Sequence, residues 1–280
     1  MTLTRSLRQP DDPFRDFCEW DYTPVTAPDT ETLRQSAFLL NALAQTPEGD
    51  HLAAVFGRIQ DRWGAFNTVW GVKSTGGALS WELYFYDYAR IDRRLGIAAL
   101  QECLPELVAP GLAAADQWPW FMFSVEFDAT TVGSAGIASV DLYFDHEGGT
   151  ISAGLSEVWD GSTRRRKNDY RFYRSFPDRT EILRDLSSLP PLPSPMQPGR
   201  YEEDVFVMAR KSHSSAIYFS RVPVWQTLKF AEDTGFSLPL TAALEADAAA
   251  LAPYLFDLGI DYSVQAGESL IRRSAIYGIF

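Results

Sequence analysis

Cysteine and histidine are rare in this sequence, and positive charges are outnumbered by negative ones. Each of these features argues against a kind of site or partner. Two cysteines, Cys18 and Cys103, among 280 residues cannot form a disulfide framework, so we expect a reducing, cytoplasmic setting. Three scattered histidines argue against a zinc site. A formal net charge of −12 argues against nucleic acid or an anionic membrane as the main partner.

Long apolar segments are also missing. No run of about 18 apolar residues occurs, so we expect no membrane-spanning helix. The first residues, MTLTRSLRQPDDPFRDF, lack the apolar core of a secretion signal. What the sequence has instead is 46% hydrophobic and 14% aromatic residues, which is typical of a globular protein with aromatic-rich sheets and ring-lined pockets. We expect one domain over residues 1–280.

Strand-like segments come in pairs after a first part, about 1–62, that is predicted to be helical. The predicted pairs are 66–74 with 79–88, 121–129 with 136–145, 150–159 with 168–176, 204–212 with 214–222, and 255–264 with 268–280. Predicted helices beginning at Asp92 and near 179–189, 224–234 and 238–252 separate most pairs, and the proline-rich segment 189–199 forms a connector. The run STRRRKND (162–169) is interpreted as a solvated loop. This order predicts an α/β fold of repeated strand–strand–helix units.

Segment 79–88, LSWELYFYDY, would present two different faces as a strand, because successive side chains alternate. Trp81 and Leu83 lie on an apolar face, whereas Glu82, Tyr84 and Tyr86 share the other. If those phenol rings faced bulk water, they would lose most of the ~25 cal/mol per Å² that burial supplies. We therefore predict an antiparallel ten-stranded β-barrel with helices outside and tyrosines around a lumen. An open sheet with one wet face is the alternative.

This pattern resembles the ABBA-type prenyltransferases, which include the soluble bacterial aromatic enzymes and the cyanobactin peptide prenyltransferases. The resemblance covers roughly residues 60–280 and depends on the strand rhythm and on four segments: NTVWGVKSTGGALSWELYFYDYARID, SAGIASVDLYFDH, HSSAIYFSRVPVWQTLKFAEDTG and the terminal RRSAIYGIF. It implies a barrel of repeated αββα units. It also implies transfer of an isoprenoid, such as dimethylallyl or geranyl, from an allylic diphosphate to an electron-rich acceptor in the lumen. That acceptor would be a small aromatic molecule or an arginine or aromatic side chain of a (cyclic) peptide.

The resemblance implies three roles for lumen side chains. Basic groups hold the diphosphate as its charge develops, ring faces shield the allyl cation, and a carboxylate positions or deprotonates the acceptor. The carboxylate is predicted to be Glu82. The predicted diphosphate ligands are Lys73, Arg171, Arg210 and Arg273, and the predicted shield is Tyr84, Tyr86, Tyr143, Tyr173, Tyr218 and Tyr277. A Mg²⁺ ion bridged by Asp141 or Asp145 is a further prediction.

Two positions depart from the family pattern. The family carries an arginine near the place of Glu82 and a lysine near 139–141, where this sequence is acidic or neutral. An acidic lumen suits a cationic acceptor, such as a guanidinium held by Glu82 through paired hydrogen bonds. Two other functions stay open: a non-catalytic barrel that binds an amphiphilic or cationic ligand, and a hydrolase using Glu82 with Glu126 or Asp141. Fewer than two of the four predicted basic ligands pointing inward would favour the binding protein.

Overall fold

Ten strands form the centre of the structure, a computed structural model that describes residues 5–90, 93–146, 153–211 and 214–280. They are β1 (Val69–Thr75), β2 (Ala78–Tyr86), β3 (Met122–Phe127), β4 (Val140–His146), β5 (Ala153–Trp159), β6 (Arg164–Arg174), β7 (Val205–Lys211), β8 (Ser215–Pro223), β9 (Leu255–Gln265) and β10 (Glu268–Ile279). Each predicted pair of segments forms one hairpin of neighbouring strands. The β1–β2 turn consists of Gly76 and Gly77, which both have positive φ (57° and 90°) and therefore favour glycine.

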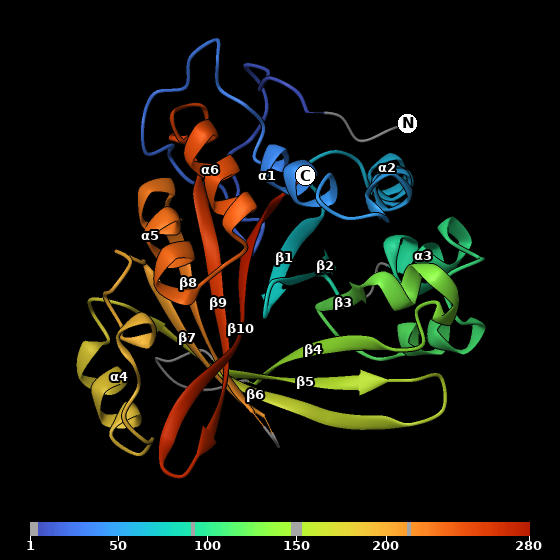
Figure 1. Cartoon of the computed structure of the whole chain (residues 1–280). Helices are drawn as coiled ribbons and strands as arrows, with labels where there is room; N and C mark the ends of the chain where they lie inside the picture. The colour runs from blue at the N-terminus through green and yellow to red at the C-terminus, as the bar shows by residue number, and fades with distance from the viewer. Residues whose placement is uncertain (1–4, 91–92, 147–152, 212–213) are drawn as a thin grey trace.

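The strands close into a barrel in the order β1-β10-β9-β8-β7-β6-β5-β4-β3-β2, and every neighbouring pair is antiparallel (Figure 1). Closure pairs β1 with β10, so that Val69 lies opposite Ile279. The predicted ten-stranded antiparallel barrel is confirmed.

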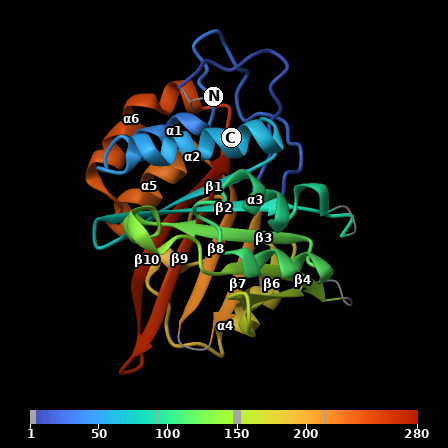
Figure 2. The ribbon, with the colours of Figure 1, turned by 90° about the vertical axis from the view of Figure 1, so that its right-hand side faces the viewer.

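Six α-helices accompany the barrel in the described part of the chain. They are α1 (Ser36–Leu43), α2 (Gly49–Trp63), α3 (Ile97–Cys103), α4 (Arg179–Leu186), α5 (Val224–Thr234) and α6 (Leu238–Leu251). Short turns of other helix types are η1 (Arg93–Leu95), η2 (Pro110–Gln117), η3 (Thr131–Ala135) and η4 (Ser194–Met196). Helices α1, α2, α5 and α6 gather over one side of the barrel (Figure 2). None of the helices within the described ranges has the length and apolar character needed to cross a membrane.

The prediction of a helical first part is wrong for residues 5–35. This stretch contains no helix and is irregular chain with isolated bridges, and the first helix begins only at Ser36. Four prolines, at positions 10, 13, 24 and 28, interrupt it. Each proline removes a backbone N–H donor, so a continuous helix cannot form there. The predicted helix start at Asp92 lies outside the described residues.

Apolar side chains divide between two cores, as the alternation in the strands requires. The larger core lies between the outer face of the barrel and the helices, where Phe38 of α1 stacks on Trp70 at 5.8 Å and Phe56 of α2 meets Phe127 edge-on at 5.2 Å. A smaller cluster inside the barrel contains tyrosines such as Tyr84. The predicted orientation, with phenol rings inward and apolar faces under the helices, is therefore confirmed for β2, β4, β8 and β10, whose tyrosines Tyr84, Tyr86, Tyr143, Tyr218 and Tyr277 lie inside.

Candidate functional site

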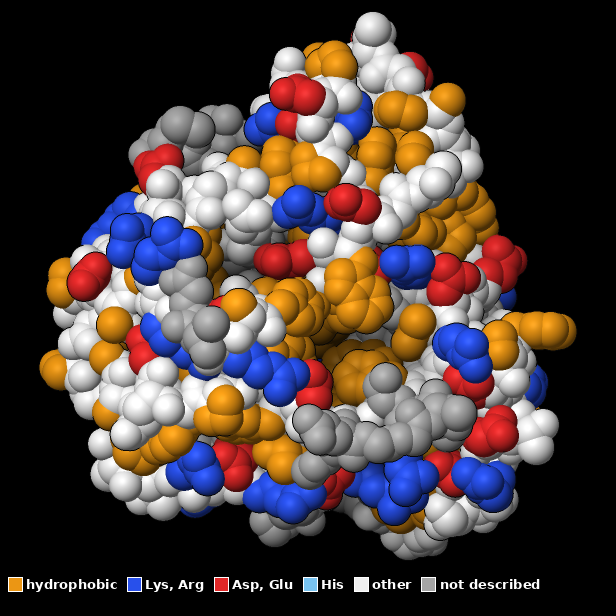
Figure 3. Space-filling model, turned by 180° about the vertical axis from the view of Figure 1, so that it is seen from behind, with side chains coloured by type: hydrophobic (Ala, Val, Ile, Leu, Met, Phe, Trp, Pro, Cys, Tyr) orange, Lys and Arg blue, Asp and Glu red, His pale blue; other side chains and the backbone are white. Residues whose placement is uncertain are grey.

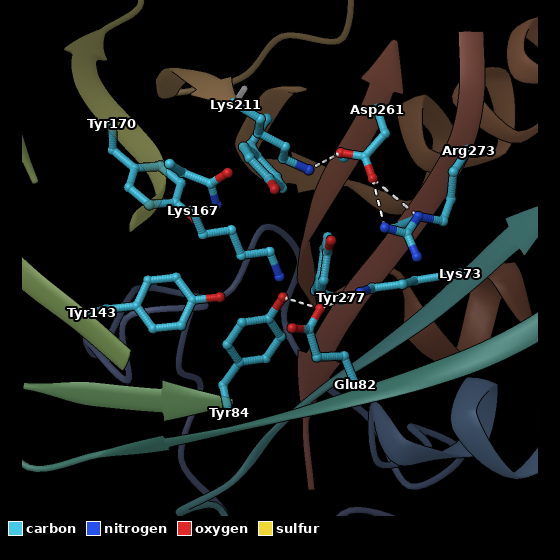
Figure 4. A pocket seen from close by; sticks show the side chains of 14 residues that line it. Lys73, Glu82, Tyr84, Tyr143, Lys167, Tyr170, Lys211, Asp261, Arg273 and Tyr277 are labelled. Atoms are coloured by element: carbon cyan, nitrogen blue, oxygen red, sulfur yellow. Dashed lines mark hydrogen bonds and ion pairs between the residues drawn. The ribbon is translucent and has the colours of Figure 1, made fainter. Parts of the chain in front are cut away.

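The lumen of the barrel contains a chamber lined by two layers of side chains (Figure 4). One layer is charged and the other consists of phenol rings. The lining residues come from eight of the ten strands: Lys73, Glu82, Tyr84, Tyr143, Lys167, Asn168, Tyr170, Lys211, Tyr218, Gly259, Asp261, Arg273, Ala275 and Tyr277. The free space among them is about 30 Å³, which suffices for a water molecule or two but not for an isoprenoid chain.

In the charged layer, cations and carboxylates alternate. One chain of ion pairs runs through Glu82, Lys73, Glu126, Arg273, Asp261 and Lys211. Arg273 bridges two strands, because its guanidinium lies 2.8 Å from Asp261 and 2.9 Å from Glu126. A separate pair joins Lys167 to Asp141. Each of the four cations therefore has a carboxylate partner, and the four positive charges balance four negative ones.

Glu82 is the most enclosed carboxylate of this layer, with a side chain only 5% exposed. It pairs with Lys73 and accepts hydrogen bonds from Ser124 Oγ at 2.7 Å and the Tyr84 hydroxyl at 2.6 Å. Burial by itself would raise the pKa of Glu82. The charges of Lys73 and Lys167, with hydrogen bonds from Lys73 and Tyr84, outweigh burial and lower the pKa to about 2. Glu82 is therefore ionised at neutral pH and can attract a cation.

Two further groups of the layer also keep their charge. Burial would lower the pKa of the Lys167 ammonium, but Asp141 and Glu82 outweigh burial and raise this pKa. Burial would likewise raise the pKa of Asp261, yet the charges of Lys211 and Arg273 lower it overall. Glu82, Lys167 and Asp261 are therefore ionic at neutral pH, whereas burial raises the pKa of Asp141 and lowers that of Lys211. A ligand that enters the layer must replace ion pairs with its own charges.

Five tyrosines form the second layer. Their ring centroids follow one another at 5.9 Å (Tyr170 to Tyr143), 6.2 Å (Tyr143 to Tyr84), 5.9 Å (Tyr84 to Tyr277) and 6.3 Å (Tyr277 to Tyr218). Burial is the main cause that raises the pKa of each of these phenols, to about 12 for Tyr170 and well above the usual value for the others. The rings are therefore neutral, and their faces can stabilise a positive charge.

Two glycines inside strands make room for these rings. A Cβ atom at Gly71 would come within 2.6 Å of the Tyr277 ring, and one at Gly259 would lie 3.0 Å from the Tyr218 ring and 3.2 Å from that of Tyr277. The rings thus lie close to the backbone at these two glycines, and a larger residue there would prevent this approach. Isolated glycines within strand patterns are a recognisable sign of such close approach.

Most of the predicted site residues meet in this chamber. Lys73 and Arg273 are two of the four predicted diphosphate ligands, and both point inward. The predicted carboxylate and four of the six predicted shield tyrosines also line the chamber: Glu82, Tyr84, Tyr143, Tyr218 and Tyr277. Tyr86 lies inside the barrel but farther along it, where its hydroxyl donates to the Phe17 carbonyl.

Three predicted lumen residues instead face outward. The Arg171 guanidinium and the Tyr173 hydroxyl both contact Asp185 of α4 at 2.6 Å, and the Arg210 guanidinium reaches the Ser188 hydroxyl at 3.5 Å. Arg171 and Arg210 border a pocket of about 270 Å³ that is built mainly from outward-facing side chains of β6 and β7. The prediction was wrong because both faces of these two strands carry apolar side chains, so alternation does not show which face is inside.

The two carboxylates predicted to bind Mg²⁺ both pair with cations. Asp141 pairs with Lys167, whereas the half-exposed Asp145 pairs with Arg90. A Mg²⁺ ion bridged by Asp141 or Asp145 stays a prediction, and either carboxylate would have to leave its ion pair to bind the ion. Throughout the described ranges, no group of three or more His, Cys, Asp or Glu side chains is arranged to hold a metal ion.

Several chamber residues were not predicted. Lys167 was placed in a solvated loop, but β6 begins at Arg164 and a register shift between Ser156 and Glu157 leaves Lys167 as an extra residue opposite β5. Such a bulge re-aims a side chain in a way that simple alternation does not predict. Lys211 did leave a signal, because the motif Lys-Ser precedes the hairpin turn both at Lys73 and at Lys211.

A scan against protein-family models and a search of curated proteins each find no match to this chain. The function proposed below therefore depends on the geometry of the lumen.

Proposed function

We propose that this protein is a prenyltransferase that moves an isoprenoid from an allylic diphosphate to an electron-rich acceptor inside the barrel. One observation carries the proposal: basic side chains from four strands and a row of five tyrosines line the same chamber. The ten-stranded antiparallel barrel is also the architecture that the resemblance to ABBA-type prenyltransferases implies. The repeated αββα organisation and membership of that family are parts of the proposal.

In the proposed reaction, the basic groups Lys73, Lys167, Lys211 and Arg273 hold the diphosphate. The allylic C–O bond breaks and both of its electrons leave with the diphosphate, whose growing charge these groups stabilise. The tyrosine faces stabilise the allyl cation and keep water away from it. The acceptor contributes an electron pair to the new bond, and Glu82 receives the proton that the acceptor loses.

The balanced charges suggest why the acceptor is itself cationic. A guanidinium or amine of a peptide that pairs with Glu82 and Glu126 would release Lys73 and Arg273 from these carboxylates. Lys73 would then be available to the diphosphate, and Arg273 would keep only Asp261 as a partner. Because the free volume is only about 30 Å³, these long side chains must also swing aside when substrates enter. Binding of the two substrates should therefore be mutually favourable.

Mass spectrometry tests the proposal. The protein is incubated with dimethylallyl, geranyl or farnesyl diphosphate and a panel of peptides containing arginine, tryptophan or tyrosine, and we expect one peptide to gain an isoprenoid mass. The gain should disappear in Glu82→Gln and persist in Glu157→Gln, because Glu157 of β5 pairs with Arg164 outside the chamber. Unchanged peptide masses across the whole panel would overturn the proposal.

A non-catalytic barrel that binds a cationic or amphiphilic ligand is the second candidate. The observation that favours it is the charge balance, because each of the four chamber cations already has a carboxylate partner. This candidate predicts that arginine-containing peptides bind, by calorimetry, with the same affinity whether or not an allylic diphosphate is present. A prenyltransferase predicts tighter peptide binding when the diphosphate is present.

A further inference from the structure

A pocket of about 270 Å³, here called the outer pocket, lies on the outer face of the barrel, where β5, β6 and β7 run side by side. It is much larger than the free space of about 30 Å³ in the chamber. Helix α4 borders this part of the sheet, as the hydrogen bond from the Tyr173 hydroxyl to Asp185 at 2.6 Å shows (Figure 1). The reaction proposed above makes no use of the outer pocket.

Two arginines line the outer pocket as neighbours. Arg171 of β6 lies opposite Met208 of β7, and Arg210 of β7 lies opposite Asp169 of β6. The two arginines are therefore diagonal neighbours on one face of the sheet, close enough for one ligand to reach both. Both side chains are exposed, so the outer pocket is open to solvent.

Arg210 has most of its hydrogen-bonding capacity to spare. Its guanidinium makes one long hydrogen bond, to the Ser188 hydroxyl at 3.5 Å, and no ion pair with any carboxylate of the described residues. Asp169, which lies across from it, pairs with Arg166 instead. Because a guanidinium carries five N–H donors in a planar fork, Arg210 can still bind an anionic group.

Arg171 is balanced only in part. The Asp185 carboxylate contacts Arg171 at 2.6 Å, but it also pairs with Arg184 at 3.3 Å. One negative charge is thus shared by two guanidinium groups, and with Arg210 these four side chains carry three positive charges and one negative. The net charge of the whole chain is −12, so positive charge gathers only in places. Lys and Arg side chains also gather along the lower part of the rear face, whereas hydrophobic side chains border its central hollow (Figure 3).

Apolar groups form another part of the wall. Ala153 of β5 and Met208 of β7 lie opposite Arg171 on its two sides, and both line the outer pocket together with Tyr173. The Tyr173 hydroxyl is already bonded to Asp185, so the ring is the part of Tyr173 that a ligand can contact. A ligand that fills this space therefore needs an apolar part beside its anionic group.

We infer that the outer pocket binds an organic carboxylate. The carboxylate accepts two parallel hydrogen bonds from the Arg210 guanidinium, Arg171 adds positive charge, and the apolar group of the ligand packs against Met208 and Tyr173. A free organic acid and the C-terminal residue of a peptide share this chemistry. The inference concerns a site outside the chamber and does not depend on the proposed function.

An NMR titration of the isotope-labelled protein tests the inference with four probes: phenylacetate, N-acetyl-phenylalanine, N-acetyl-phenylalanine amide and acetate. We expect the first two to bind and to shift signals of β6 and β7. The amide lacks the charge and acetate lacks the apolar group, so each should bind at least about tenfold more weakly. Tighter binding of phenylacetate would assign the site to a free acid, and tighter binding of N-acetyl-phenylalanine would assign it to a peptide C-terminus; both support the inference.

Variants show whether Arg210 is the recognising group. Arg210→Met should weaken binding of N-acetyl-phenylalanine at least about tenfold, and Arg210→Lys should have an intermediate effect, because it keeps the charge but not the planar fork. Arg174→Met is the matched control and should bind as the wild type does, because Arg174 is an exposed arginine of β6 that pairs with Asp178 and does not line the outer pocket.

Several results would overturn the inference. They are equal binding of the acid and its amide, unchanged affinity in Arg210→Met, and no binding of either aromatic acid. A loss of diphosphate affinity in Arg210→Met would also overturn it, because the outer pocket would then bind the diphosphate. None of the carboxylate titrations measures isoprenoid transfer, so a failure of the proposed function would leave the inference standing, and the reverse also holds.

Discussion

The ion pair between Lys73 and Glu82 provides the sharpest test of how the lumen is stabilised. Both side chains are almost fully buried, at 7% and 5% exposure. Lys73→Met removes the nearest cation from a carboxylate that is still enclosed. Breaking a buried pair from one side costs about 3–5 kcal/mol, because an unpaired charge remains in the interior. Glu82 keeps its hydrogen bonds from Tyr84 and Ser124, so we expect the lower end, a loss of about 3 kcal/mol.

The pKa of Glu82 leads to a similar magnitude. It is lowered from 4.5 to about 2, and each pKa unit corresponds to about 1.4 kcal/mol, so the ionised form contributes about 3 kcal/mol to stability at neutral pH. A lowered carboxyl pKa means that this contribution is present above about pH 4.5 and disappears as the pH falls toward 2. In Lys73→Met, the acid-induced loss of stability over this range should be much smaller.

The double variant Lys73→Met/Glu82→Gln completes the test. It removes both charges, while the amide can keep part of the hydrogen bonding, so we expect its stability to return to within about 1 kcal/mol of the wild type. Urea unfolding, followed by the fluorescence of the eight tryptophans, measures the free energy of unfolding of each variant. An unchanged m-value shows that the same amount of surface becomes exposed on unfolding. Arg210→Met, on the outer face, is the control and should change stability by no more than about 0.5 kcal/mol. A stability loss in the double variant that equals the sum of the losses in Lys73→Met and Glu82→Gln would refute the reasoning.

Three further predictions concern the chamber and its surroundings. Lys211→Met should weaken diphosphate binding at least about tenfold in calorimetry, whereas the neighbouring outward-facing Arg210→Met should leave it unchanged, because only Lys211 reaches the chamber; equal effects would contradict this. Burial, followed by the charge of Asp16, raises the pKa of Asp257 to about 7, so its stabilising contribution exists below about pH 4 and is lost as the pH rises through 7. The unfolding temperature of Asp257→Asn should therefore fall less between about pH 4 and pH 7 than that of the wild type. An equal fall in both proteins would show that Asp257 is not the group that causes it. Gly71→Ala should cost about 1–3 kcal/mol in urea unfolding because its Cβ would overlap the Tyr277 ring; wild-type stability would show that the ring moves freely.

The strand pairs and the inward face of the first hairpin could be predicted from the sequence. In 81–86 every second residue is apolar and the residues between are a carboxylate and two phenols, so alternation has one solution that buries the apolar face under helices. The same reasoning failed for β6 and β7, where Tyr173 and Phe172, or Phe206 and Val207, place apolar groups on both faces. Orientation there is decided by contacts with other elements, such as Asp185 of α4, which holds Tyr173 outside.

By itself, the sequence determined the number and pairing of the strands, because local alternation, turn glycines and β-propensity act over a few neighbouring residues. Only the tertiary structure decided which charges meet. Glu82 lies opposite Glu126 because β2 pairs with β3. Arg273 pairs with Asp261 across the β9–β10 hairpin, but it reaches Glu126 of β3 only because the barrel is closed between β10 and β1. Glu126 is far from both Glu82 and Arg273 in the chain, and the energy of an ion pair depends on close approach of its two charges. The charge balance of the lumen is therefore a property of the closed barrel.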